Sequence, residues 1–363
     1  MSRWIKFAVS LAITIGCMWW TFRGVFEIDP KTNVRVLDEM LVALKSANWW
    51  WMAPYLAMLT LIHLARTKRW GNLLSGIETV PFKKLNEASA IGFMMLIILP
   101  FRLGEFARPF LIAERSNIRR SAAMASVVFE RVVDGVLIAM LLLTLMIFIP
   151  GESADISRIR LGAYGMAAVF GGGLVFLLIA RARHDLVVRL LRATVGRVSM
   201  GLTEKVIGVI DGFVGALKQL PDGKNMAEFF VWTALYWALN GWGMSMVANA
   251  FDCGHGAELS CQPLHITFFQ GFVVLCVLIV GMMIPAAPGS AGTFQAFIML
   301  ALGVFVPADV VGSSGLAYAN VLWIIQILQQ VLFGLVFMVA SNASFSDIAG
   351  KLSSSSQDQA PTA

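Results

Sequence analysis

Apolar runs about as long as a bilayer is thick recur along almost the whole chain. A hydrocarbon layer of about 30 Å requires roughly 20 consecutive apolar residues in a helix. No small-residue cleavage site follows the first run, so we expect it to remain as a span and not to be removed as a signal peptide. Runs of this kind predict spanning helices over residues 3–22, 49–65, 121–149, 161–180, 226–250 and 316–341.

Two further apolar regions, 88–113 and 265–306, are interrupted near their middle by the strings ILPFRLGEFARPF and IPAAPGSAGTF. If 88–113 crossed the bilayer once, the basic residues before and after it would lie on opposite sides of the membrane. Lys and Arg collect in cytoplasmic loops, which argues against a single crossing. A re-entrant hairpin enters and leaves on one side and removes the conflict. We predict one such hairpin in each region.

This topology separates the basic residues strongly between the two sides. It places twenty of the 28 Lys and Arg residues in cytoplasmic segments, with 66–87 among them, and six in outside loops. Arg102 and Arg131 are left within the membrane. Both termini are then cytoplasmic, in a multi-pass protein of the bacterial cytoplasmic (inner) membrane. Arginines interleave with Leu and Val in the cytoplasmic segment 181–225, as in an amphipathic helix on an anionic leaflet or in a plain basic connector.

The predicted order of elements repeats. Two spans, a hairpin and a span occur in residues 1–150 and again in 151–345, and the second set starts from the opposite face. We predict an all-α polytopic membrane protein with about six full transmembrane helices and two opposed re-entrant hairpins in an inverted-topology repeat. Transporters use this architecture to build a site at the midplane. Residues 1–345 would form one transmembrane domain, and the polar residues 346–363 a disordered cytoplasmic tail.

Composition agrees with a membrane protein. Of the 363 residues, 58% are hydrophobic and 14% are charged, whereas soluble domains average about 25% charged residues. The net charge of +6 is what an excess of basic cytoplasmic residues produces. The sequence contains no nucleic-acid-binding module, phosphate-binding loop or nucleophile elbow. We therefore expect no nucleic-acid partner and no cofactor.

Three ionisable residues, Glu130, Arg131 and Asp134, lie inside the span 121–149. At a rise of ~1.5 Å per residue they begin roughly 14 Å into the helix, near the bilayer centre, where a charge facing lipid is costly. Two interpretations fit. The cluster is a buried salt bridge that locks a hairpin onto the span, or it is a net negative site that binds a proton or cation.

The break of the first hairpin carries Arg102, Glu105 and Arg108. A helix that restarts after Gly104 presents unpaired N–H groups, which attract anions, and Arg is a bidentate partner for phosphate. The three side chains contact an anionic substrate, or they neutralise one another in a structural ion-pair network.

The second break is uncharged. Its glycines permit positive φ, and Ser290 and Thr293 can cap the following helix. It forms a cradle for a head group, or a tight turn needed only for packing. Glutamines in or beside the spans, such as Gln326, are expected to form interhelical hydrogen bonds. The residues of this candidate cradle are Pro288, Gly289, Ser290, Gly292, Thr293 and Gln295.

Cys253 and Cys261 share the short outside loop FDCGHGAELSC. They can form a disulfide in an oxidising compartment. Asp252, His255 and Glu258 lie in or beside the same loop, but their spacing matches no common metal motif, so we expect no metal site.

The strings RLGEFARPFLIAERSNIRRSAAMASVVFERVVDG and PAAPGSAGTFQAF resemble the flippase-like membrane domain of lysylphosphatidylglycerol synthases (the multiple peptide resistance factor) and stand-alone membrane proteins built on that domain. The resemblance covers about residues 5–340. The family string R-x-G-E-x-x-R corresponds to Arg102, Gly104, Glu105 and Arg108. The string E-R-x-x-D corresponds to Glu130, Arg131 and Asp134. The string P-G-x-x-G-x-x-E/Q corresponds to Pro288, Gly289, Gly292 and Gln295.

The resemblance implies movement of a phospholipid or a lipid-linked anionic amphiphile between leaflets. Arg102, Arg108 and Arg131 would hold phosphate, and the neighbouring carboxylates would orient them or carry a coupling proton. Gln295 stands where many relatives have Glu, which argues against a proton-linked role there. Membrane lipids are the expected partners, and a lipid-biosynthesis enzyme is a further candidate.

We expect a transporter and not an enzyme. The sequence carries no soluble aminoacyl-transferase domain, so lysyl-phospholipid synthesis is not expected. Two other hypotheses stay open. One is an intramembrane lipid-linked glycosyl or phosphoryl transferase that uses Glu130 and Asp134 as bases. The other is a non-transporting membrane scaffold.

Overall fold

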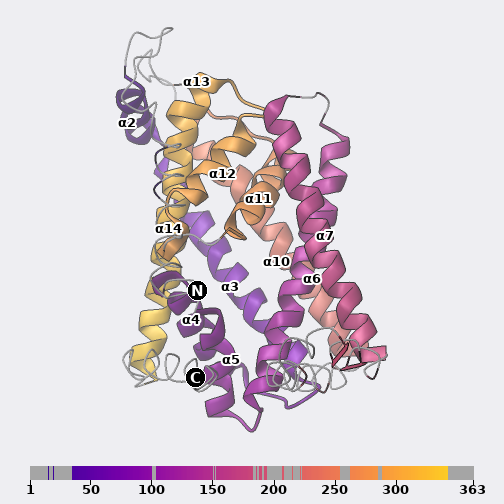
Figure 1. The fold of residues 1–363 in the computed structure, drawn as a ribbon. Coiled ribbons are helices and arrows are strands. Elements are labelled where there is room, and N and C mark those ends of the chain that lie inside the picture. The colour runs from indigo at the N-terminus through magenta and orange to yellow at the C-terminus, as the bar shows by residue number, and fades with distance from the viewer. Residues whose placement is uncertain are drawn as a thin grey trace.

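The computed structural model describes residues 35–99, 104–149, 153–182, 223–253, 262–284 and 288–341, with a few isolated positions besides. All regular structure in these ranges is helical (Figure 1). Most of the predicted span 3–22, most of segment 181–225 and the predicted tail lie outside the described residues, as do Arg102 and Cys261.

Four long helices coincide with predicted spans. Among the residues that the structure describes, two apolar stretches, Ala154–Ile179 and Ala308–Ala340, meet the length and composition needed to cross a membrane. In Figure 1 the longest helices run most of the height of the molecule. The four are α6 (Arg120–Ile147), α7 (Ala154–Ala182), α10 (Gly223–Ala248) and α14 (Leu316–Ala340).

Helix α3 (Met52–Leu74) continues well past residue 65, where we predicted its span to end. The predicted end of the span at residue 65 is therefore wrong, because Arg66 and Arg69 both lie within this helix. Arg69 is 0% exposed. A span predicted from hydropathy ends where the first charged residues occur. This helix continues further because carboxylates on α6 compensate the charge of Arg69.

Both interrupted regions form pairs of antiparallel helices. The first pair is α4 (Phe82–Ile98) and α5 (Ala107–Arg115), and the second is α11 (Phe268–Met282) and α12 (Thr293–Leu302). In the first pair the chain comes very close to α4: a Cβ added at Gly104 would lie 2.0 Å from the backbone nitrogen of Leu96. Only glycine permits this approach.

The two helix pairs lie at opposite ends of the bundle, α4–α5 in the lower half of Figure 1 and α11–α12 in the upper half. Their tips meet near the middle. The turn η5 (Pro288–Ser290) contacts the end of α4, and a Cβ added at Gly289 would lie within 4.0 Å of Ile97.

The contacts between helices fall into matching sets. Helix α3 packs on α10. The contact of α4 with α14 corresponds to that of α11 with α6. The contact of α5 with α6 corresponds to that of α12 with α14. The helices α3, α4, α5 and α6 therefore correspond in their contacts to α10, α11, α12 and α14. The remaining short elements are α2 (Val36–Ser46), η1 (Trp49–Trp51), η4 (Asn249–Phe251), α13 (Ala308–Val310) and the π-helical turn η6 (Val311–Gly315).

Candidate functional site

A buried ion cluster joins α3 to α6. Glu130 and Asp134 are four residues apart and share one face of α6. Arg69 of α3 reaches both: its Nη1 and Nη2 donate to Asp134 Oδ1 and Oδ2 at 2.7 Å each, and Nη2 also donates to Glu130 Oε1 at 2.7 Å. Arg69 and Glu130 are both 0% exposed. The planar guanidinium suits this bidentate arrangement, and the pairing compensates the cost of burying the charges.

Helix α10 completes the set of donors to Asp134. The indole Nε1 of Trp237 donates to Asp134 Oδ1 at 3.1 Å. The guanidinium carbon of Arg69 lies 4.6 Å from the ring centroid of Tyr236, the neighbour of Trp237. The cluster therefore ties three helices together.

Arg108 of α5 approaches the cluster from the first helix pair. Its Nη2 lies 3.5 Å from Glu130 Oε2. Its guanidinium carbon stacks over the rings of Trp70 at 4.3 Å and Phe93 at 4.7 Å. A Cβ added at Gly92 would lie 2.3 Å from Arg108 Cγ, so this glycine on α4 leaves space for the side chain. Arg108 is thus a buried counter-ion of Glu130.

Two further arginines line a cavity beside the cluster. Arg131 lies 3.3 Å from Glu130 Oε1 and 3.9 Å from Asp134 Oδ2, with 30% of its side chain exposed. Arg66 stacks on Phe93, with its guanidinium carbon 3.4 Å from the ring centroid. Within the part of the chain that the structure describes, Arg66 forms no ion pair, and its buried Nε has no hydrogen-bond partner.

The charge of the site is positive. Four guanidinium groups, those of Arg66, Arg69, Arg108 and Arg131, lie around Glu130 and Asp134. A third carboxylate, Glu105, lines the cavity near Arg131, so four positive charges face three negative ones in the described part of the site. The interpretation of a net negative site is therefore wrong, because it counted α6 alone. A site with excess guanidinium attracts an anion.

The cavity has a volume of about 440 Å³, within the range of small-ligand pockets. It lies between the tips of the two helix pairs, with walls from α3, α4, α6, α7, α10, α11, α12 and α14. Its polar lining residues are His63, Arg66, Glu105, Arg131, Asp134, Tyr236, Trp237, Asn240, Ser290, Trp323, Gln326, Gln329 and Gln330.

The structure brings part of the predicted site into this cavity. The predicted residues that line it are Glu105, Arg131, Asp134, Gly289 and Ser290. Five others do not line it: Arg108 and Glu130 are buried behind it, and Gly292, Thr293 and Gln295 are buried in the second tip. The side chain of Pro288 lies outside the described part of the chain. Arg102 is not among the described residues.

The second tip has an unusual backbone. Gly289 has φ +68°, as its permissive backbone allows, and Ser290 has φ +53°. A non-glycine residue in this region is strained, and such strain clusters at ligand sites. The indole Nε1 of Trp323 on α14 donates to the Gly289 carbonyl at 2.7 Å and holds the turn in place.

Capping of α12 by Ser290 or Thr293, which we predicted, does not occur. The N-cap residue is Gly292, and no side chain caps the helix from that position. Instead Gln295 Oε1 accepts from the Gly292 N–H at 2.9 Å, and Gln295 Nε2 donates to Asn320 Oδ1 at 3.1 Å. Gln295 therefore fixes the turn and joins it to α14.

Sequence reasoning missed Arg66, Arg69 and Trp237. One signal could have found the first two: His63, Arg66 and Arg69 are spaced by three residues and so lie near one another on one helix surface. The predicted interhelical bond of Gln326 is confirmed, because its Nε2 donates to the Tyr55 hydroxyl of α3 at 2.9 Å.

The structure describes two of the four cysteines. Cys253 is disulfide-bonded; Cys261, its predicted partner, lies outside the described residues. Cys276 is free and buried. No group of three or more His, Cys, Asp or Glu suited to a metal occurs where the structure is described.

The fold and the site together define an all-helical protein whose apolar helices enclose an ionised cavity. The chain belongs to the family described as lysylphosphatidylglycerol synthase TM region, whose model matches residues 7–329. It is therefore a membrane protein, and the family indicates a membrane lipid-related function. No curated protein and no solved structure matches the chain.

Proposed function

We propose that this protein moves a phospholipid or a lipid-linked anionic amphiphile between leaflets, and that the cavity holds the phosphate of its head group. The environment of Arg66 is the observation on which the proposal rests. It is a cavity-lining cation that packs on an aromatic ring and forms no ion pair within the described ranges. A guanidinium kept at a cavity wall without a carboxylate is suited to an incoming anion.

The other three arginines of the site have two different roles. Arg131 shares the cavity wall with Arg66 and can contact the same phosphate, while Arg69 and Arg108 hold the carboxylates behind it. A hydrogen bond to a charged group contributes about 1.5–3 kcal/mol. Loss of Arg66 would then weaken binding by roughly 10–100-fold, at about 1.4 kcal/mol for each factor of ten.

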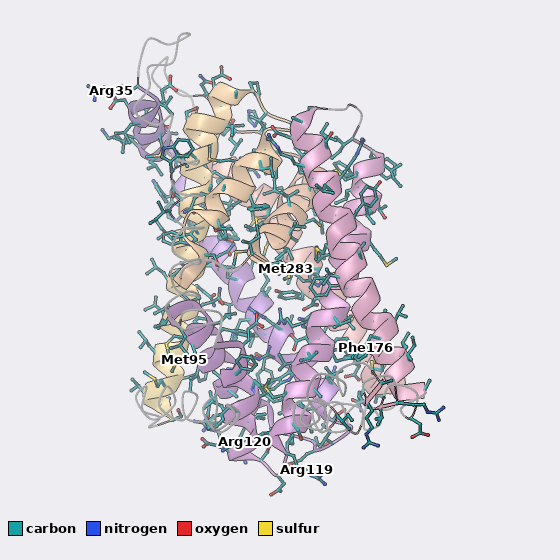
Figure 2. All side chains as sticks on the ribbon, in the orientation of Figure 1. Arg35, Met95, Arg119, Arg120, Phe176 and Met283 are labelled. Atoms are coloured by element: carbon teal, nitrogen blue, oxygen red, sulfur yellow. The ribbon has the colours of Figure 1, made fainter. Side chains whose placement is uncertain are left out.

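We infer that the two helix pairs are re-entrant hairpins and that the chain is a multi-pass inverted repeat of the cytoplasmic membrane, with about six full spans. The matching contacts of α3–α6 and α10–α14 support this inference. So does the entry of the pairs from opposite ends (Figure 1). We assign the end that carries Arg119 and Arg120, at the bottom of Figure 2, to the cytoplasm. We propose that both termini belong to that side as well. Rocking of the halves about the cavity would expose it to each leaflet in turn.

We favour a transporter over a lipid-modifying enzyme because the carboxylates of α6 are already engaged. Both oxygens of Asp134 accept from Arg69, and Glu130 lies against Arg69, Arg108 and Arg131. A general base needs an oxygen within reach of the proton it removes.

The test is leaflet-to-leaflet movement of a labelled anionic phospholipid in proteoliposomes. We expect Arg66→Gln to slow movement by at least about tenfold, as the lost hydrogen bonds imply. Lys68→Gln is the matched control, because Lys68 is an exposed cation on the same helix; it should move lipid like the wild type. Equal rates for Arg66→Gln and the wild type would refute the proposal. Covalently altered lipid in the same vesicles would favour an enzyme.

A further inference from the structure

The cavity wall contributed by α14 differs from the wall that holds the arginines. Trp323, Gln326 and Gln330 follow one another at spacings of three and four residues, so they share a face of α14, and Gln329 lies beside them. All four line the cavity. The wall is therefore a set of amides next to an indole ring.

These amides retain hydrogen-bonding capacity. Gln329 is 8% exposed, and its Nε2 has no partner among the described residues. Gln326 uses its Nε2 on the Tyr55 hydroxyl, and Gln330 uses its Nε2 on the Gln326 carbonyl at 3.4 Å. No hydrogen bond to the side-chain oxygen of either glutamine occurs in the described structure. A buried donor such as Gln329 Nε2 is costly to leave unpaired. Because Gln329 lines the cavity, a ligand hydroxyl that entered beside it would supply the missing partner.

Charge is distributed unevenly around the cavity. Its ionisable lining residues, apart from tyrosine, belong to α3, α6 and the segment just before α5, and they are His63, Arg66, Glu105, Arg131 and Asp134. The oxygens of Asp134 are occupied by Arg69 and Trp237, and Glu105 lies close enough to Arg131 to interact electrostatically. The α14 side offers no carboxylate to an ammonium group.

We propose that the cavity selects a phosphate-linked head group whose far end is neutral and rich in hydroxyls, such as glycerol or a sugar, over one that ends in an amine. This inference rests on the proposed function, since the arginines hold the phosphate. An amide presents a donor and an acceptor together, which matches a hydroxyl. A site built to hydrogen-bond a hydroxyl rejects analogues that lack it, because its own polar groups are then left unpaired.

The remaining wall identifies the source of the head group as a lipid and not a soluble phosphoester. Apolar side chains of α11, Leu275, Leu278 and Ile279, line the cavity. They lead to Met283 and Ile284, which are 40% and 36% exposed. Figure 2 places Met283 near mid-height of the bundle. An acyl chain can therefore pass from the cavity into hydrocarbon along an apolar path.

The experiment compares lipid binding to the purified full chain in detergent by native mass spectrometry. The probes are phosphatidylglycerol and phosphatidylinositol, which end in hydroxyls, phosphatidylserine, which is anionic but ends in an amino acid, and phosphatidic acid, which ends at its phosphate. We expect at least tenfold preference for the first two. Gln329→Leu should reduce the preference for phosphatidylglycerol over phosphatidic acid to within threefold. Binding of phosphatidic acid serves as the internal control for folding and should not change.

Three results would overturn the inference. Equal binding of phosphatidylserine and phosphatidylglycerol would show no selection for hydroxyls, and an unchanged preference in Gln329→Leu would show that α14 does not read the head group. Displacement of phosphatidylglycerol by soluble glycerophosphoglycerol at equal concentration would refute the lipid source. The Arg66→Gln variant separates these failures from a failure of the proposed function. If this variant loses binding of all four lipids, the phosphate site at Arg66 still stands even where the head-group inference fails. Unchanged binding in that variant would refute the proposed function itself.

Discussion

Replacement of Arg69 by Met should destabilise the protein more than any other change at the site. Its three hydrogen bonds of 2.7 Å engage two carboxylates, and both Arg69 and Glu130 are 0% exposed. Without it, Glu130 keeps only Arg131 at 3.3 Å and Arg108 at 3.5 Å. Removal of one partner from a buried ion pair costs about 3–5 kcal/mol. At roughly 2 °C for each kcal/mol in a large domain, Tm should fall by about 6–10 °C.

The assay is thermal unfolding of the purified protein in one detergent, followed by size-exclusion fluorescence. Arg131→Met is the matched control, because Arg131 belongs to the same cluster but has 30% of its side chain exposed; its Tm should change by about 2 °C or less, as for a partly solvated ion pair. Asp134→Asn added to Arg69→Met should recover part of the lost stability, because it removes one unpaired charge. A loss in Arg69→Met no greater than in Arg131→Met would refute the assignment of Arg69 as the central counter-ion.

Two further changes test the framework around the site. Gly104→Ala should lower Tm and prevent close packing of α4 and α5, because the added Cβ would lie 2.0 Å from the Leu96 nitrogen; a Tm equal to that of the wild type would contradict this packing. Trp237→Phe removes one hydrogen bond to Asp134 but keeps an aromatic ring, so it should cost about 1.5–3 kcal/mol, measured by the same unfolding assay. No loss of stability would show that Asp134 does not need the indole.

The sequence predicted the parts of this structure that depend on local chemistry. Strings that combine Pro with Gly favour helix breaks, so both breaks were visible in the sequence around Gly104 and Gly289. The spacing of Glu130 and Asp134 likewise placed two carboxylates on one helix face before their partner was known.

The partner of those carboxylates could not be predicted from hydropathy. A topology based on basic residues assigns every arginine after an apolar run to a loop, and this rule placed Arg69 in the cytoplasm. The charge is stable inside the bundle because α3 and α6 pack together, which is a tertiary contact between residues more than 60 positions apart. The same limit applies to Gln329 on α14. The spacing of its glutamines indicates a polar face, but the sequence does not show that this face meets a cavity lined by arginines of other helices.

The most direct test of the central claim is an electron cryomicroscopy structure of the protein in nanodiscs that contain phosphatidylglycerol. We predict density for a lipid phosphate in the cavity between the tips of the two helix pairs, within hydrogen-bond distance of Arg66, with acyl chains leaving beside Met283. An empty cavity, with lipid bound only on the outer surface of the bundle, would contradict it.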